Sequence, residues 1–148
     1  MLTDDINILL VEDNDDHAEI ISRNVLKFCK PKKLLRVEDG QEAIDFLLKT
    51  GKFLNSEDYF VPKLILLDIK LPKKDGIEVL QFIKNTPELL SIPVIMLTSS
   101  ESENDILKSY INHANSYIVK PINFKDFQDL IKDMGIYWFQ WNKDTSVK

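Results

Sequence analysis

The sequence contains very little cysteine and histidine. Among its 148 residues, Cys29 is the only cysteine, and His17 and His113 are the only histidines. One cysteine cannot form an intramolecular disulfide or a multi-thiolate metal site, and two histidines alone do not make a conventional zinc site. We therefore expect Cys29 to be a small apolar residue at a helix end, and both histidines to lie on the surface.

Long apolar runs and an excess of positive charge are also missing. A run such as Leu64 to Leu67 is far too short to span a bilayer, and no basic region precedes an apolar stretch at the N-terminus, so no signal peptide is expected. The 19 Lys and Arg against 24 Asp and Glu give a formal charge of −5, which offers no general attraction to nucleic acid or anionic lipid. The composition predicts a cytoplasmic protein that binds neither nucleic acid nor membrane.

The chain does have five short apolar runs that alternate with helical periodicity. The runs predict strands near residues 6–11, 33–37, 64–67, 93–97 and 116–119. Helical spacing of apolar residues follows each run, and a longer loop is expected at residues 51–62. Five repeats of strand and helix predict an α/β fold, a doubly wound parallel sheet with helices on both faces. The length suits one domain, with at most a short appendage.

Polar side chains follow four of these runs at the point where each strand ends. Glu12 and Asp13 follow the first strand, Asp68 the third, Thr98 the fourth and Lys120 the fifth. Since the carboxyl ends of parallel strands meet at one edge of a sheet, these side chains are expected to converge there. Three crowded carboxylates need a cation when all are ionised, and oxygen ligands of this kind suit Mg²⁺.

A carboxylate, a magnesium ion, a lysine and a hydroxyl together indicate phosphoryl transfer. Asp68 can act as a nucleophile and form an acyl phosphate. Lys120, Thr98 and the metal would each hold one phosphoryl oxygen, where negative charge gathers in a loose transition state.

These residues, in this order, resemble the receiver domain of two-component response regulators, including the chemotaxis regulators. The matching features are the pair Glu12-Asp13, Asp68 in the stretch Leu-Leu-Asp-Ile-Lys-Leu-Pro-Lys-Lys-Asp-Gly, Thr98 30 residues later and Lys120 52 residues later. The resemblance covers about residues 5–135 and implies a single receiver domain with the flavodoxin-like (βα)5 fold and strand order 2-1-3-4-5. Residues 136–148 would form an aromatic helical extension and tail.

The resemblance also implies the roles at the metal site. Asp68 would be the phosphoacceptor, Asp13 a direct magnesium ligand and Glu12 a ligand acting mostly through water. The backbone carbonyl of Lys70 would complete the protein's share of the metal shell.

A second set of implied roles concerns the conformational switch. Thr98 would move toward the phosphoryl group, and Tyr117 would swing inward behind it. Lys120-Pro121 matches a pair whose peptide bond is characteristically cis in the family. Lys70 and Ser100 stand at variable positions beside the phosphoryl group, so the lifetime of the phosphorylated form stays open.

The implied function is a stand-alone switch that accepts a phosphoryl group from a histidine kinase, catalysing only its own phosphorylation and dephosphorylation. Beyond residue 135 only 13 residues remain, too few for a DNA-binding output domain. A binding module that signals without phosphorylation is the first alternative, which the complete set of site residues disfavours. A hydrolase would be helped by a second aspartate where Lys70 stands. A flavin carrier would have phosphate repelled by Glu12 and Asp13.

The end of the sequence carries an aromatic stretch, Tyr137-Trp138-Phe139-Gln140-Trp141. These rings either fold back on the same domain or form a homodimer contact through Trp138 and Trp141, since clustered aromatic residues favour interfaces. Together with the loop at 51–62 and the Leu-Pro-Lys-Lys-Asp-Gly stretch, the tail resembles the stand-alone regulators that are paired with phytochrome-type histidine kinases.

Overall fold

The protein folds around one parallel five-stranded sheet in the order β2-β1-β3-β4-β5, and the computed structural model describes residues 6–143. The strands are β1 (Asn7–Val11), β2 (Lys33–Val37), β3 (Leu64–Leu67), β4 (Val94–Thr98) and β5 (Ser116–Val119). The expected fold class and strand order are confirmed. The strands formed because each is a short apolar run that can be buried on both faces of a parallel sheet.

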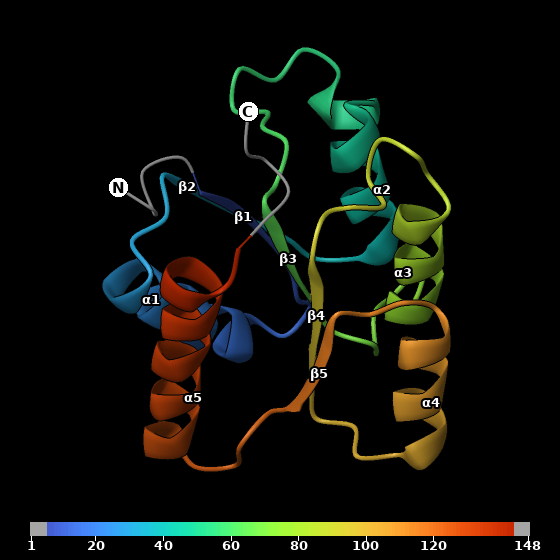
Figure 1. Cartoon of the computed structure of the whole chain (residues 1–148). Helices are drawn as coiled ribbons and strands as arrows, with labels where there is room; N and C mark the ends of the chain where they lie inside the picture. The colour runs from blue at the N-terminus through green and yellow to red at the C-terminus, as the bar shows by residue number, and fades with distance from the viewer. Residues whose placement is uncertain (1–5, 144–148) are drawn as a thin grey trace.

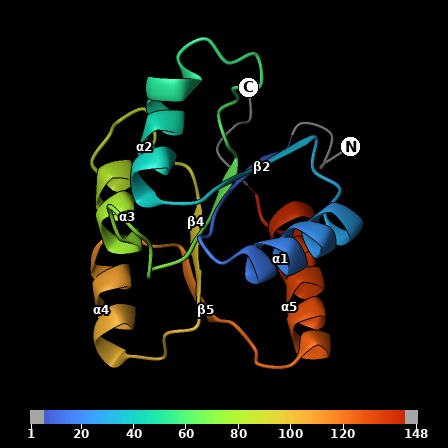
Figure 2. The ribbon, with the colours of Figure 1, turned by 180° about the vertical axis from the view of Figure 1, so that it is seen from behind.

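Helices cover both faces of this sheet (Figure 1). They are α1 (Asp15–Phe28), α2 (Gly40–Leu48), α3 (Gly76–Lys84), α4 (Glu103–Ile111) and α5 (Phe124–Ile136). The pair α1 and α5 lies on one face and the set α2, α3 and α4 on the other, as the view from behind also shows (Figure 2). No helix within residues 6–143 is long and apolar enough to cross a membrane.

Alternation along each strand creates two separate cores. In β1, Leu9 and Val11 point to the core under α2 and α3, whereas Ile8 and Leu10 point to the core under α1 and α5. Because successive side chains of a strand point to opposite faces, one apolar run supplies both layers.

Each α-helix within residues 6–143 begins with a side-chain cap in the segment that follows the preceding strand. The caps are Asn14, Asp39, Asp75, Ser102 and Asn123, and each accepts a hydrogen bond from a backbone N–H in the first turn of its helix. The caps fix where each helix begins after the carboxyl end of its strand, the edge at which the polar residues gather.

The expected loop at 51–62 is held down by aromatic packing rather than left open. It begins with a short 3₁₀ turn, Gly51–Phe53. The ring of buried Phe46 lies 5.1 Å from that of Phe53, 5.3 Å from that of Tyr59 and 5.0 Å from that of Phe60, measured between centroids. This cluster ties the loop to α2.

The aromatic stretch continues α5 as a π-helical turn, Tyr137–Trp141. Phe139 is buried and Trp138 packs partly against the core under α1 and α5, whereas Trp141 remains 74% exposed. The rings therefore divide between packing on their own domain and exposure. The rest of the predicted tail, residues 144–148, lies outside the described residues.

Candidate functional site

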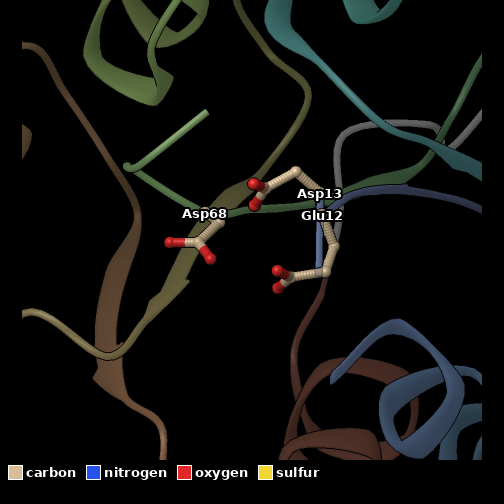
Figure 3. Close-up of side chains that lie close together, drawn as sticks. All are labelled: Glu12, Asp13 and Asp68. Atoms are coloured by element: carbon tan, nitrogen blue, oxygen red, sulfur yellow. The ribbon is translucent and has the colours of Figure 1, made fainter. Parts of the chain in front are cut away.

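The three predicted acids meet at the carboxyl edge of the sheet (Figure 3). One carboxylate oxygen from each of Glu12, Asp13 and Asp68 lies within 4.8 Å of the others. Glu12 and Asp68 are buried and Asp13 is exposed. They line an open cavity of about 450 Å³. The convergence expected from the ends of the strands is thus present.

Lys120 crosses the site and joins two of these acids. Its Nζ donates to Glu12 Oε1 at 2.6 Å and to Asp68 Oδ2 at 2.9 Å, with the lysine side chain only 2% exposed. A buried ammonium between two carboxylates compensates part of the repulsion between them. The fixed positive charge predicted at this position therefore lies directly beside Asp68.

His17 also belongs to the site, which corrects the expectation that it lies on the surface. Its Nδ1 is 3.0 Å from Lys120 Nζ, and the ring lines the same cavity. Burial and the positive charge of Lys120 lower the pKa of this imidazole below its usual value. A signal was available: His17 precedes buried Ile21 by four residues, which puts both on the inward face of α1. His113 is exposed, as expected.

Glu12 is held from several directions. Its side-chain Oε2 accepts a hydrogen bond from the N–H of Asn14 at 3.2 Å, and its backbone N–H donates to the carbonyl of Val37 at 3.1 Å. Burial raises its pKa to about 7, reinforced by the charge of Asp68 and opposed by the hydrogen bond from Lys120. The carboxyl is thus easily protonated unless a further cation joins the site.

Arg36 supports this turn and was missed in the sequence. From β2, its Nε donates to the carbonyl oxygen of Glu12 at 2.8 Å, and its guanidinium pairs with Asp15 at 3.0 Å. A charged residue between Leu35 and Val37, in an otherwise apolar strand, was the available signal. Arg36 fixes the backbone from which Glu12 and Asp13 project.

Thr98 and Tyr117, the two residues expected to form the switch, lie on the neighbouring strands β4 and β5, and each bonds to the backbone of Ser100. Thr98 ends β4, is buried and lines the cavity, and its hydroxyl oxygen accepts from the N–H of Ser100 at 3.3 Å. The Tyr117 hydroxyl donates to the carbonyl oxygen of Ser100 at 2.9 Å, and the Ser100 hydroxyl donates to Asp105 at 2.6 Å. Ser100 therefore connects Tyr117 to α4, while the switch roles of Thr98 and Tyr117 stay predictions.

The expected cis peptide bond is not found. No cis bond occurs within residues 6–143, so Lys120–Pro121 is trans. An X-Pro bond prefers trans by only about 0.5–1 kcal/mol, and the dipeptide alone therefore does not determine the isomer. Lys70 is exposed and lines the cavity, where a ligand role for its carbonyl stays a prediction.

The donor set suits a hard divalent cation. All three candidate side-chain ligands are carboxylates, they converge, and an open cavity adjoins them. Magnesium and manganese favour oxygen ligands and keep several waters, for which an open site leaves room. With His17 bonded to Lys120, the arrangement does not resemble a zinc site.

Comparison with known proteins agrees with this geometry. The sequence profile of the response regulator receiver domain matches residues 8–132. The chain belongs to this family. As a receiver domain it belongs among the proteins that act as phosphoryl-accepting switches and that bind a divalent metal in an acidic pocket; in this chain, Glu12, Asp13 and Asp68 form an acidic cluster.

Three relatives illustrate the likeness. The probable methanogenesis regulatory protein FilR2 of Methanothrix harundinacea is 39% identical over 92% of this chain and 85% of its own. The response regulator Rcp1 of Synechocystis is 39% identical over 90% of this chain and 88% of its own, and its Mn²⁺-bound structure superposes with a TM-score of 0.86 over 95% of this chain and 99% of that one. The structure of the phosphorylated cyanobacterial phytochrome response regulator RcpA, which is 38% identical, superposes with a TM-score of 0.89 over 96% of this chain and 99% of that one. The resemblance to phytochrome-associated regulators is confirmed.

Proposed function

We propose that this receiver domain accepts a phosphoryl group from a histidine kinase on Asp68, in a magnesium-dependent reaction, and signals by a change of conformation. The observation that carries the proposal is the position of the Lys120 ammonium, 2.9 Å from one oxygen of Asp68 and 2.6 Å from Glu12. A buried lysine held against the predicted nucleophile is poised to hold a phosphoryl oxygen as well. The phosphorylated RcpA and Mn²⁺-bound Rcp1 are consistent with this chemistry.

The residues divide the work of the transfer. An oxygen of Asp68 attacks the phosphorus, the new O–P bond forms, and the P–N bond to the donor histidine breaks with its electron pair returning to the imidazole nitrogen. Lys120 and the Thr98 hydroxyl donate to phosphoryl oxygens as negative charge gathers there. Magnesium bound by Asp13, Asp68, the Lys70 carbonyl and, through water, Glu12 would neutralise the crowded oxygens. Attack of water on the phosphorus would later break the O–P bond to Asp68 and release inorganic phosphate, which is autodephosphorylation.

A small phosphodonor tests this directly. Incubation of the protein with acetyl phosphate and Mg²⁺ should add one phosphoryl group, detected by intact mass, and Asp68→Asn should abolish the addition. Asp58→Asn, the same change at an exposed residue of the loop before β3, is the matched control and should react like the wild type. A wild-type protein that stays unmodified while another receiver reacts contradicts the proposal.

A histidine kinase of the phytochrome type is the proposed partner, on the likeness to Rcp1 and RcpA. Phosphotransfer from a panel of phosphorylated kinases of the source genome should be fastest with a phytochrome-type kinase. Equal rates across the panel would contradict this pairing.

Signalling through protein contacts is the proposed output, with Thr98 and Tyr117 as the switch. Phosphorylation would draw the Thr98 hydroxyl toward Asp68 and shift the bonds of Ser100, which already links Tyr117 to α4. If partner binding is the same for the wild type and Asp68→Asn, with and without phosphodonor, the protein is instead a binding module that signals without phosphorylation.

Assembly and location complete the proposal. The chain acts as one receiver unit with an aromatic extension in the cytoplasm, and exposed Trp141, with Trp138 beside it, contributes to a homodimer contact. The proposed partners include neither a nucleic acid nor a membrane.

A further inference from the structure

The Lys120 ammonium has three N–H bonds, and each has one acceptor. These are Glu12 Oε1 at 2.6 Å, Asp68 Oδ2 at 2.9 Å and His17 Nδ1 at 3.0 Å. An ammonium has no lone pair and can only donate, so Nδ1 is the acceptor and the imidazole is neutral with its proton on Nε2. Since the Lys120 side chain is almost fully buried, an N–H left without an acceptor would be costly. His17 therefore completes the coordination of the lysine.

His17 differs from the other two acceptors because it is uncharged and takes no part in binding the cation or the phosphoryl group. Glu12 and Asp68 are carboxylates, and both are needed for the cation or the phosphoryl group during transfer. The neutral imidazole competes for neither. Once Asp68 carries a phosphoryl group, the N–H of Lys120 that pointed to Asp68 donates to a phosphoryl oxygen instead. The hydrogen bond to His17 is kept and still holds the ammonium in place.

The fold holds the imidazole firmly in this place. The backbone N–H of His17 donates to the cap residue Asn14 at 3.0 Å, which sets the first turn of α1. The ring centroid lies 6.4 Å from that of buried Phe127 on α5, and the two rings are tilted by 57°. A ring fixed by a capped helix and by an aromatic neighbour gives Lys120 a rigid acceptor.

We propose that His17 is a positioning residue, whose neutral imidazole holds the Lys120 ammonium where it meets the phosphoryl oxygens. This inference rests on the proposed phosphorylation of Asp68. It assigns a reaction role to a residue that neither binds the metal nor accepts the phosphoryl group.

Two substitutions separate the acceptor from the ring. His17→Phe keeps a ring against Phe127 and removes the acceptor, whereas His17→Asn loses the ring and keeps an acceptor oxygen the same number of bonds from Cβ as Nδ1. At saturating Mg²⁺ with acetyl phosphate, we expect His17→Phe to react about tenfold more slowly than the wild type. His17→Asn should recover most of that rate, and Mg²⁺ affinity measured by calorimetry should stay close to wild type in both.

The matched control is His113→Asn, which removes the exposed histidine at the end of α4 and should leave the rate unchanged. The inference is overturned if His17→Phe reacts like the wild type, if His17→Asn is as slow as His17→Phe, or if Mg²⁺ affinity falls in step with the rate. If the wild type itself is not phosphorylated, the proposed function fails, and this inference with it.

A spectroscopic test does not use the His17 variants; it reads the tautomer from the wild type and the contact with the lysine from Lys120→Met. Long-range ¹H–¹⁵N spectra of the histidine side chains should show His17 as the Nε2–H tautomer, with a Nδ1 resonance that shifts in Lys120→Met. A proton on Nδ1 near neutral pH, or a resonance indifferent to Lys120→Met, would overturn the inference.

Discussion

The Glu12 carboxyl lies buried beside another acid and one lysine, so its charge depends on what else the site holds. Burial is the largest influence and raises the pKa to about 7, although the hydrogen bond from Lys120 acts in the opposite direction. In the folded protein without metal, the protonated form is therefore favoured as the pH falls through 7. A bound cation favours the ionised form and reverses this preference.

Magnesium binding should accordingly release protons near neutral pH. Affinity should be full above about pH 7 and weaken as the pH falls through it, because the proton and the ion compete for the site. Calorimetric titrations in buffers of different ionisation enthalpy would measure the release, and Glu12→Gln should abolish it. A carboxyl with a pKa near 7 is largely protonated between roughly pH 6 and 7. If the wild type binds Mg²⁺ in that range without releasing protons, the prediction is wrong.

Burial also raises the pKa of the Cys29 thiol, and here it acts without a neighbouring charge. Burial raises the pKa of its thiol to about 12, and Gly135 of α5 makes room for the sulfur, since any larger side chain there would overlap Sγ. The folded pKa lies above the ordinary value of 9.0, so the stability given by the neutral thiol is present below pH 9 and is lost as the pH rises from 9 toward 12.

Cys29 should therefore react slowly with maleimides in the native protein. Only the thiolate is a strong nucleophile, and a buried thiol is both neutral and inaccessible. The rate should rise to that of a free thiol in denaturant, as mass spectrometry with N-acetylcysteine for reference would measure. Rapid labelling under native conditions would show that the end of α1 opens far more easily than its packing indicates.

At the level of helices and strands, the sequence predicted most of what positions the site. Each strand is an apolar run that ends at a polar residue, and parallel pairing brings those polar residues to one edge of the sheet. Helical spacing places His17 on the same face of α1 as buried Ile21, so the expectation that it lies on the surface was wrong; its contact with Lys120, however, depends on how α1 packs. The peptide isomer before Pro121 depends on tertiary surroundings, and so does the partner of Arg36: a lone charge in an apolar strand marks the residue but does not identify Glu12 as its acceptor.

The start of α3 is the element most tightly fitted to the phosphoacceptor. The N–H of Gly76 donates to the carbonyl of Ile69 at 2.8 Å, and a Cβ at Gly76 would overlap the backbone carbonyl of Asp68. Gly76→Ala should therefore lower the free energy of unfolding by about 1–3 kcal/mol and slow phosphorylation by displacing Asp68.

Denaturant unfolding and acetyl phosphate kinetics would measure both effects of Gly76→Ala. Gln81→Ala, on the exposed side of the same helix, is the control and should change neither. An alanine at position 76 without loss of stability would mean that the turn between β3 and α3 has space that the structure does not show.

Across the whole molecule, the sheet separates the reactive edge from the aromatic extension. The acids and Lys120 lie at the carboxyl ends of the strands, whereas Trp138 lines a cavity of about 500 Å³ with Lys63 and Pro93, which stand just before β3 and β4. A contact made by the extension therefore leaves the cavity around Asp68 open. Association and phosphorylation can proceed independently unless α5 couples them.

The exposed Trp141 allows this separation to be tested. Trp141→Ser should shift the protein from dimer to monomer at micromolar concentration, as sedimentation velocity would measure, while its rate of phosphorylation stays unchanged because the ring is remote from Asp68. Leu107→Ser, at another exposed apolar residue, on α4, is the control and should keep the dimer. Trp138→Ser should in addition lower stability, since that ring packs partly on the core. A wild-type protein that sediments as a monomer with and without phosphodonor would rule out the dimer and leave the aromatic extension as packing for α5 alone.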